Sequence, residues 1–569
     1  MMIIKALQTN NYNPISHKYE DKASITKLIF ITWFILAVIL CLVEASTLDV
    51  LPSLMQDEAQ ITDYGRLTLD PLSRWSVTWW VAGDKPLLLW SYLGPVFAEL
   101  GYQFGGTSGV GPRIVALIGG LAAATVALAW LNQRKVPAAF AGLLSLAFLL
   151  DPLFTLSQRM ARTDSWVIAF CLTSCWLLRL SSNKEGTTRI LLVMLAGVLA
   201  ALSAFVWPSA LFLYPLILAE FLSSFYDGHF TRNSLQKTGK LFLYFVIGGL
   251  LTSILLLIPI RHQLTPIFED MKNMVALNVN ASKTSFERIS GIFNYQSWAK
   301  IAKAFIKTLG PFLPLLGVWA LFFRRERGII IAFIFTLIII LTTLVYEFRL
   351  LYLLPYFMVL TGNLFLKAER KSVKPAVQRV SAGLLAFTVL WSICISVVLR
   401  SAFAYKDGAQ RERNLIEAAA RSAIGTGNHK VFLAFTYEFY FTGRSLGWEM
   451  YTPYIQFSFD EDGNWIREND FKPKDRFMKL LAQMDYAIFS GSELDEDLSA
   501  QLRSSGLDYH GAIHIGMQQP KGNITSTDRS IGGIFSWYIQ GAPSYGPYML
   551  FARADKKARP STILVQKSQ

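Results

Sequence analysis

The chain has 569 residues, of which 53% are hydrophobic and 17% charged, and its mean hydropathy is +0.36. One soluble core cannot bury that much apolar surface, so the composition excludes an ordinary soluble enzyme and indicates that lipid solvates much of the chain. The net charge is +14, but Lys and Arg fall in short clusters between apolar runs and form no basic domain, which excludes a nucleic-acid partner.

The chain begins with a polar stretch, residues 1–24, which we expect to be a cytoplasmic tail, flexible over its first twenty residues. The first apolar run is about twenty residues long and has no evident small-residue cleavage site, so it predicts a transmembrane helix and not a cleaved signal peptide. About eleven such runs predict a polytopic α-helical membrane module over residues 25–399. They lie near 25–46, 111–131, 137–157, 165–181, 188–206, 208–226, 239–260, 304–323, 328–346, 349–367 and 379–399.

The orientation follows from the basic clusters. A twelfth run, 86–104, is interrupted by Gly94-Pro95 and is only moderately hydrophobic, which suits a helix lying along the interface. If this run does not cross, all the basic clusters fall on one side, which the positive-inside rule makes the cytoplasm. These clusters lie near 5–22, 134–135, 179–189, 232–240, 324–327 and 367–379. We therefore expect the amino terminus inside and the carboxyl terminus outside.

Three outward segments are then long enough to build a site: 47–110, 261–303 and the tail 400–569. The tail is more polar than the rest, and its patterns predict strands at 430–435, 486–490 and 548–553 and helices near 409–423 and 475–484. A periplasmic α/β domain of this length could fold alone.

The cysteines and the outward histidine give little support for a cofactor. Cys41, Cys171, Cys175 and Cys394 all lie in apolar runs, so no outward disulfide is expected. The pair Cys171 and Cys175 is one helical turn apart and reads more readily as small packing residues than as metal ligands. His262 has no partner at ligand spacing. The sequence thus predicts no certain cofactor, and a divalent metal would need ligands from distant segments.

Charged side chains cluster at the outward ends of the spans. Asp57 and Glu58 follow the first span, where two adjacent carboxylates are either simply solvated or held for a task. Lys85 precedes a proline that could start the interfacial helix, so it could meet a phosphate at the membrane surface or be a snorkelling anchor.

Two further turns carry charges. Arg159, Arg162 and Asp164 lie in the short turn between the third and fourth spans, where Asp164 could also act only as a helix cap. Arg349 lies between the ninth and tenth spans, where it could bind a phosphate bidentately or pair with Glu347.

The ordered set of these motifs resembles the superfamily of protein O-mannosyltransferases and aminoarabinose (4-amino-4-deoxy-L-arabinose) transferases, which are multi-span glycosyltransferases of the GT-C fold. The resemblance covers most of residues 25–400, agrees in spacing and sidedness, and does not extend clearly into the tail. The motifs are Asp57-Glu58-Ala59, Lys85-Pro86-Leu87 with Trp90, Arg113, Arg162-Thr163-Asp164 and Tyr352-Leu353-Leu354-Pro355.

The resemblance implies a role for each site residue. Asp57 would be the catalytic base, and Glu58 and Asp164 would organise the acceptor or the sugar. The cations would bind the donor phosphate: Lys85 first, Arg349 as a second contact, and Arg159 and Arg162 as further candidates.

Two departures from the family pattern are visible. Leu87 stands where the family often has a second proline, and this change puts little in doubt. Gln60-Ile61 replaces an Arg-Tyr pair after Asp-Glu-Ala, which weakens assignment to one subfamily and therefore to one sugar.

The expected function is transfer of a monosaccharide from a polyprenyl-phosphate donor to an acceptor hydroxyl or phosphate, with the active site facing the periplasm of a bacterial inner membrane. A lipid-phosphate sugar has a good leaving group, so one carboxylate base and one or two cations suffice, and direct displacement inverts the anomeric centre. The acceptor would be an envelope glycan, a lipid or a protein. No phosphate-cradling glycine loop is found on a cytoplasmic segment, in agreement with a lipid-borne donor.

Two other functions compete with this one. A transporter or flippase of lipid-linked sugars would also be basic and polytopic, but it would place ionisable groups near the bilayer midplane and show repeated halves, whereas these charges lie at the outer ends of spans. A sensor or scaffold would predict no defect when Asp57 and Lys85 are neutralised.

Overall fold

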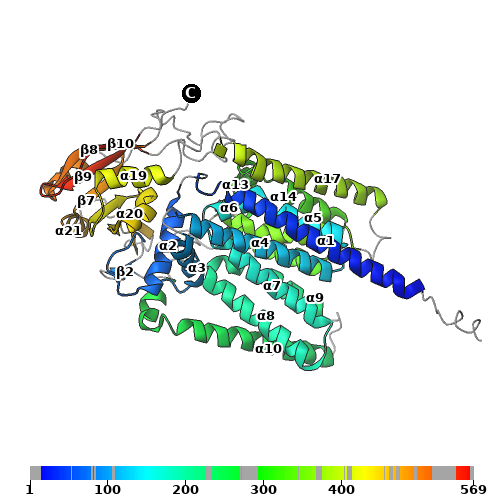
Figure 1. Cartoon of the computed structure of the whole chain (residues 1–569). Helices are drawn as coiled ribbons and strands as arrows, with labels where there is room; N and C mark the ends of the chain where they lie inside the picture. Colours follow the sequence, from blue (N-terminus) through cyan, green and yellow to red (C-terminus); the bar gives the residue numbers. More distant parts are fainter. Residues whose placement is uncertain are drawn as a thin grey trace, which may run out of the picture.

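The structure is a computed structural model in which a helical bundle carries a smaller α/β domain at one end (Figure 1). The amino end of the first helix lies at the opposite end of the bundle from this C-terminal domain (Figure 1). The structure describes residues 14–50, 52, 54–78, 81–82, 85–86, 88–105, 109–225, 232–268, 271, 292–323, 326–343, 345–366, 374–402, 404–405, 413–453, 455–459, 465–469, 475–491, 496–515 and 546–563.

The bundle confirms the polytopic α-helical prediction, since each of the predicted apolar runs contains an apolar helix. Six of the described helices are long and apolar enough to cross a membrane, or seven if α5 and α6, bent by 50° at Asp151-Pro152, form one span. The helices are α1 (Pro14–Ala45), α4 (Val110–Gln133), α5 (Ala138–Leu149), α6 (Pro152–Arg159), α7 (Asp164–Ser182), α8 (Gly186–Val206), α9 (Tyr214–Phe225), α10 (Arg232–Leu257), α14 (Phe312–Phe323), α15 (Arg327–Thr342), α16 (Leu354–Asn363) and α17 (Pro375–Ile393).

Several predicted runs are shorter as helices than as sequence, because proline interrupts them. Pro208 follows the end of α8 and opens the 3₁₀ segment η1 (Pro208–Phe212), so the next run is divided between η1 and the short α9. The remaining short segments of the bundle are η2 (Arg261–Gln263), α13 (Tyr295–Lys307), η3 (Glu347–Leu353) and the π-helical η5 (Cys394–Leu399). At the amino terminus α1 begins at Pro14, so residues 14–24 of the expected tail are helical, whereas residues 1–13 lie outside the described part.

Small residues allow the helices to approach closely. A Cβ on Gly197 of α8 would lie 1.9 Å from the carbonyl oxygen of Phe245, and one on Gly248 of α10 would lie 2.2 Å from that of Met194. Such close approach is typical of helix packing in membranes, where van der Waals contact replaces the hydrophobic effect. Cys171 and Cys175 are fully buried in the same bundle core, as the packing interpretation predicts.

The first of the predicted outward segments, 47–110 (hereafter the first outward loop), contains α2 (Gln56–Leu69), the short antiparallel pair β1 (Val81–Ala82) and β2 (Lys85–Pro86), and α3 (Leu93–Gly105). The prediction that Pro86 starts an interfacial helix is wrong, because Lys85 and Pro86 pair with β1 and the helix begins at Leu93. The proline that lies in the first turn of this helix is Pro95, where its missing N–H costs nothing.

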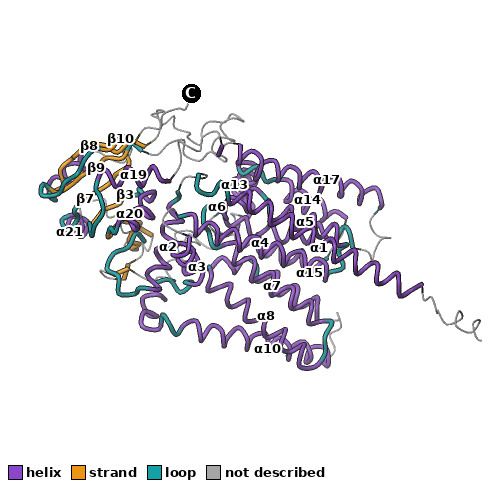
Figure 2. The backbone as a smooth tube through the Cα atoms, in the orientation of Figure 1, coloured by secondary structure: helices purple, strands orange, loops and turns teal. Residues whose placement is uncertain are grey.

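The C-terminal domain contains a six-stranded mixed sheet in the order β10-β8-β9-β7-β3-β4, gathered at one end of the molecule (Figure 2). Its predicted strands and helices are all confirmed. The elements are α19 (Arg413–Ala423), β3 (Lys430–Ala434), η6 (Tyr437–Phe439), α20 (Tyr440–Leu446), β4 (Glu449–Tyr451), β5 (Ile455–Phe459), β6 (Trp465–Asn469), α21 (Asp475–Leu481), β7 (Tyr486–Ser490), α22 (Glu496–Ser504), β8 (Leu507–Ile515), β9 (Tyr548–Arg553) and β10 (Ser561–Ile563).

The sheet of this domain has an apolar core on each face. Val431 and Leu433 of β3 enter one core, while Phe432 and Ala434 enter the other, because side chains alternate along a strand. The first of these cores also takes in Leu54, Ala59 and Val77 from the first outward loop. The domain therefore shares one of its two cores with the loop that carries Asp57.

Candidate active site

Asp57 and Glu58 occupy the first turn of α2, where carboxylates are stabilised by the positive end of the helix dipole. Their environments differ. The side chain of Asp57 is 34% exposed, whereas that of Glu58 is fully buried. The two neighbouring carboxylates therefore cannot have the same task.

Glu58 is held in a closed ion pair with Arg113 of α4. The guanidinium donates from Nε and Nη2 to the two carboxylate oxygens, each at 2.6 Å, and from Nη1 to the carbonyl oxygens of Leu48 and Pro52 at 2.8 and 2.9 Å. Glu58 also accepts a hydrogen bond from the backbone N–H of Met55, which precedes α2. This arrangement fixes the start of α2 and with it the position of Asp57.

Asp57 forms an ion pair with Arg162, from the turn between α6 and α7. The Nε of Arg162 donates to Asp164 Oδ2 at 2.8 Å, and the hydroxyl of Tyr352 donates to the other oxygen of Asp164 at 2.6 Å. The preceding Ala161 has a φ of 49°, in the left-handed region that non-glycine residues seldom adopt. The turn is thus held in an unusual conformation that directs Arg162 towards Asp57.

The charges in this cluster reinforce one another. Burial alone would lower the pKa of Arg162, but the Asp164 and Asp57 carboxylates outweigh burial and raise the pKa above its usual value. Arg162 is consequently a permanent cation with two carboxylate partners. Of these, Asp164 is nearly buried and Asp57 is open to solvent.

Aromatic residues and a further arginine lie next to the charged cluster formed by Asp57, Arg162 and Asp164. The guanidinium of Arg162 lies 4.2 Å from the ring centre of Phe348 and 5.9 Å from that of Tyr346. Arg349, next along η3, donates to the Thr343 hydroxyl at 3.2 Å. Glu347, two residues before Arg349, forms an ion pair with a lysine of α13, Lys307, at 3.1 Å.

Arg159 lies in a different environment from Arg162. Its Nη1 donates to the carbonyl and carboxylate of Glu44 at the end of α1, and its Nη2 donates to the carbonyl and hydroxyl oxygens of Thr47, both at 2.8 Å. Arg159 is 1% exposed. These contacts join α6 to the end of α1 in the interior, whereas the ion pair with Asp57 is made by Arg162.

Two predicted features fall partly or wholly outside the described structure. Lys85 is placed on β2 by its backbone, but its side chain is not described, and most of the predicted outward loop 261–303 lies outside the described residues. His262 is exposed in η2.

Among the residues that the structure describes, no three His, Cys, Asp or Glu side chains are grouped in a way that could hold a metal ion.

Sequence reasoning missed Phe348 as an arginine contact and gave no role to Tyr352, although both lie in the segment that includes Arg349 and the Tyr-Leu-Leu-Pro motif. A tyrosine inside that motif was the available signal. The bond between Tyr352 and Asp164 spans 188 residues of sequence, so local pattern could not have found it.

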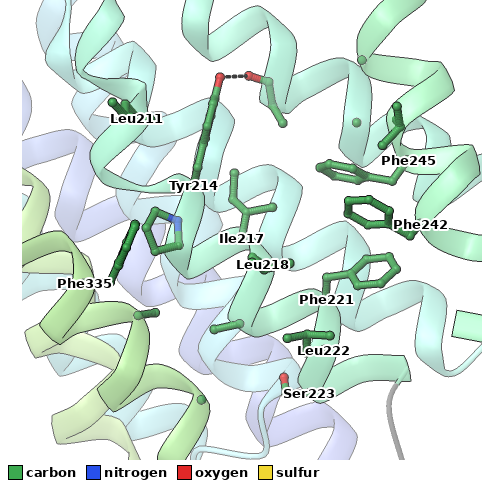
Figure 3. A pocket seen from close by; sticks show the side chains of 18 of the residues that line it. Leu211, Tyr214, Ile217, Leu218, Phe221, Leu222, Ser223, Phe242, Phe245 and Phe335 are labelled. Atoms are coloured by element: carbon green, nitrogen blue, oxygen red, sulfur yellow. Dashed lines mark hydrogen bonds between the residues drawn. The ribbon is translucent and has the colours of Figure 1, made fainter. Parts of the chain in front are cut away.

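An apolar groove of about 960 Å³ runs between α8, α9, α10 and α15 (Figure 3). Phe221, Phe242, Phe245 and Phe335 are among the aromatic side chains that line it, and Figure 3 shows them facing the same space. Small residues of α8 and α10, among them Gly197 and Gly249, also line it. Most of the residues that line the groove are apolar.

The segment η1 lies between one end of the groove and the residues of η3. Leu211 lines the groove, and the next residue, Phe212, has its ring centre 5.6 Å from that of Tyr352 and 5.9 Å from the guanidinium carbon of Arg349. The opposite end of the groove is lined by Ser223 and Glu326.

The fold matches that of a solved membrane protein, ArnT from Cupriavidus metallidurans bound to undecaprenyl phosphate. The TM-score is 0.51 at 13% identity, over 84% of this chain and 96% of that one. ArnT in the apo state gives a TM-score of 0.43 at 12% identity over the same shares, and the archaeal oligosaccharyltransferase AglB from Archaeoglobus fulgidus gives 0.40 at 11% identity over 92% and 88%.

No family model and no curated protein sequence matches the chain. At 13% identity, the match to ArnT establishes a shared fold and nothing further. It confirms the GT-C membrane fold that the resemblance to the aminoarabinose transferase superfamily predicts. The chain is therefore a multi-pass membrane protein with the fold of the aminoarabinose transferase ArnT.

Proposed function

We propose that the protein is a glycosyltransferase that moves a monosaccharide from a polyprenyl-phosphate donor to an acceptor hydroxyl or phosphate, with Asp57 as the base. The observation that carries the proposal is the ion pair between the partly exposed Asp57 and the buried Arg162, which Asp164 and Tyr352 hold in place. The shared fold supports the same function, since ArnT was solved with undecaprenyl phosphate bound.

The reaction is a single displacement at the anomeric carbon. Arg162 binds Oδ2 of Asp57, and a third of the Asp57 side chain is exposed, so its other oxygen can accept the proton of an acceptor hydroxyl. The acceptor oxygen forms a bond to the anomeric carbon while the bond from that carbon to the phosphate oxygen breaks. The electron pair leaves with the polyprenyl phosphate, and the configuration of the sugar is inverted.

The cations of the site would stabilise the departing phosphate. Arg349 lies beside the end of the groove near η3, and Lys85 is retained as a donor contact from the sequence resemblance. Arg162 would contribute charge while it orients Asp57. We assign Arg159 to the interior contact between α6 and α1, and Glu58 and Asp164 to positioning of Asp57 and Arg162 through the bonds described above.

The apolar groove would take the isoprenoid chain of the donor. Its volume of about 960 Å³ and its aromatic lining suit a long hydrocarbon chain, and its end at Leu211 lies next to η3. The donor phosphate and sugar would then reach the charged cluster without leaving the membrane surface. The acceptor, an envelope glycan, a lipid or a protein, would enter from the exposed side of Asp57.

We further propose that the protein lies in a bacterial inner membrane with Asp57 facing the periplasm. The support is the position of the C-terminal domain and α2 at one end of the bundle and of the amino end of α1 at the other (Figure 1). Basic clusters such as that at Arg134 and Lys135 fall on the side of the amino terminus, which the positive-inside rule assigns to the cytoplasm.

The test is sugar transfer in reconstituted vesicles that contain undecaprenyl-phosphate sugars, offered one at a time to wild type, Asp57→Asn and Asp70→Asn. Asp70 is the matched control, because it is an exposed aspartate at the other end of the same helix. We expect Asp57→Asn to lower kcat by about 10²–10⁴-fold with an unchanged melting temperature, and Asp70→Asn to keep wild-type activity.

Equal activity of both variants would remove Asp57 from the mechanism. No transfer by the wild type with any donor, together with movement of the lipid-linked sugar between leaflets, would establish the flippase instead.

A further inference from the structure

The C-terminal domain contacts α2, the helix that carries Asp57. Asp63 lies on α2 six residues after Asp57, which places it about 9 Å along the helix axis at 1.5 Å per residue. Its carboxylate is fully buried and accepts from Arg66 Nε at 2.7 Å, from the Ser76 hydroxyl at 2.6 Å and from the Val77 N–H at 2.8 Å. These three donors come from the first outward loop.

The fourth donor to Asp63 comes from the C-terminal domain. The hydroxyl of Tyr440, the first residue of α20, donates to Asp63 Oδ1 at 3.1 Å. Tyr440 is fully buried, and burial together with the neighbouring Asp63 carboxylate raises its pKa well above the usual value, so the hydroxyl stays protonated and remains a donor. This bond joins positions 377 residues apart in the chain.

A second contact of α20 holds the same region from the side of α3. Arg444 donates from Nη1 and Nη2 to the two carboxylate oxygens of Glu99 at 2.6 and 2.8 Å, and its guanidinium lies 4.0 Å from the ring centre of Tyr102. Its Nη1 also donates to the Tyr440 hydroxyl at 3.4 Å. The contacts of α20 with α2 and with α3 therefore form one network.

The opposite side of α2 leaves little room for movement. A Cβ on Gly65 would lie 2.0 Å from the carbonyl oxygen of Pro95, so α2 and α3 are in backbone contact there. At its start α2 is fixed by the ion pair of Glu58 with Arg113. The helix is thus held by α3, α4 and the C-terminal domain, and the position of Asp57 depends on all three.

We propose that Tyr440 is a positioning residue for the transfer reaction: through Asp63 it sets the position of α2 and hence of Asp57 against Arg162. The inference rests on the proposed function, because it takes Asp57 as the base. It assigns to the C-terminal domain a part in catalysis that is exerted through the position of α2. A shift of α2 would misplace the base without altering the groove that binds the donor chain.

The experiment compares Tyr440→Phe with Tyr486→Phe in the vesicle assay. Each variant loses one hydroxyl from a buried tyrosine of the C-terminal domain, but the Tyr486 hydroxyl donates to the Lys557 carbonyl oxygen and not to α2. We expect Tyr440→Phe to lower kcat about tenfold and to leave the KM for the polyprenyl donor unchanged. Tyr486→Phe should match wild type.

Measuring Tyr440→Phe in an Arg162→Lys background tests whether its effect on kcat depends on the ion pair between Asp57 and Arg162. If Tyr440 acts by holding Asp57 against Arg162, then Tyr440→Phe should cost less in an Arg162→Lys background than in the wild type, because the pair is already disturbed. An unchanged kcat in Tyr440→Phe would overturn the proposal, as would equal losses in Tyr440→Phe and Tyr486→Phe. If Tyr440→Phe lowers kcat by the same factor in both backgrounds, the proposal is also overturned.

Gln60→Ala keeps the proposal testable if Tyr440→Phe fails to fold. Gln60 lies on α2 and donates to the hydroxyl of Tyr437 of the same domain at 3.3 Å. A fall of about twofold to threefold in kcat would support positioning by the domain, and an unchanged kcat would overturn it. An Asp57→Asn variant that retains activity would instead reject the proposed function.

Discussion

Asp57 and Glu58 are adjacent in α2, yet they form ion pairs of opposite kind. Side chains one residue apart point about 100° apart around a helix, so Glu58 turns into the bundle and Asp57 turns towards the open end. The Glu58–Arg113 pair is 0% exposed on both sides, whereas Asp57 is 34% exposed against 9% for Arg162. The comparison teaches that two neighbouring carboxylates of one helix can differ fully in exposure, and only the exposed one is accessible to a substrate.

The comparison is tested most severely by Glu58→Gln. Removing one partner of a buried ion pair leaves the Arg113 charge uncompensated, which typically costs about 3–5 kcal/mol. We expect the melting temperature in detergent to fall sharply and the yield of folded protein with it, whereas Asp57→Asn should leave both unchanged. Thermal unfolding of the two variants side by side gives the measurement.

The double variant Glu58→Gln/Arg113→Gln is the matched control for that loss. Because it removes both charges, it should recover part of the stability that Glu58→Gln loses. A single Glu58→Gln variant that is stable but inactive would contradict the assignment and make Glu58 a reactive group.

Asp164→Asn tests whether Asp164, the buried partner of Arg162, supports the ion pair between Arg162 and Asp57. Asp164 binds both Arg162 and Tyr352, so the amide would weaken the hold on Arg162 without touching Asp57 directly. The loss of one hydrogen bond to a charged group, about 1.5–3 kcal/mol, predicts a fall in kcat of about tenfold to a hundredfold. Tyr352→Phe, which removes a single donor to Asp164, should lie between this variant and wild type. Equal kcat in Asp164→Asn and wild type would show that Arg162 needs no support.

The sequence was sufficient for the features that depend on local pattern. Apolar runs located the helices, and alternation located β7 and β9 at their observed bounds, because hydropathy and side-chain period are properties of neighbouring residues. The start of α3 was misjudged because two prolines, Pro86 and Pro95, both fit a first helical turn, and strand pairing with β1 decided between them.

The site could be predicted only as a set of residues. Charges at the outer ends of spans identified Asp57, Glu58, Arg162 and Asp164, but not which of them meet. The partner of Glu58 is 55 residues away and that of Asp57 is 105 residues away, so tertiary packing alone made the two pairs and their different exposures. The contacts between the C-terminal domain and α2 could not be predicted for the same reason.

Leu218→Trp tests whether the groove serves the donor that the open pair would act on. Leu218 of α9 lines the groove and is 49% exposed, so a larger side chain would narrow the groove without disturbing the core. We expect the KM for a full-length polyprenyl donor to rise about fivefold to tenfold, equivalent to displacing one or two buried CH₂ groups. A short-chain, water-soluble donor should show no change.

The control for this variant is Leu195→Trp on α8. Leu195 is 46% exposed and is not among the residues that line the groove. If both variants raise the KM alike, the effect belongs to the membrane surface of the bundle in general and the groove loses its proposed occupant.

Phe348→Leu sharpens the comparison on the side of Arg162. The ring of Phe348 lies 4.2 Å from the Arg162 guanidinium and is 6% exposed, so leucine keeps most of the packing but removes the attraction between cation and ring. That attraction is worth about 0.5–2 kcal/mol, which predicts a fall in kcat of about twofold to thirtyfold. The Glu58–Arg113 pair has no part in this contact, so the melting temperature should change little. A large fall in melting temperature with normal kcat would mean that Phe348 supports the packing of η3 and not the arginine that holds Asp57.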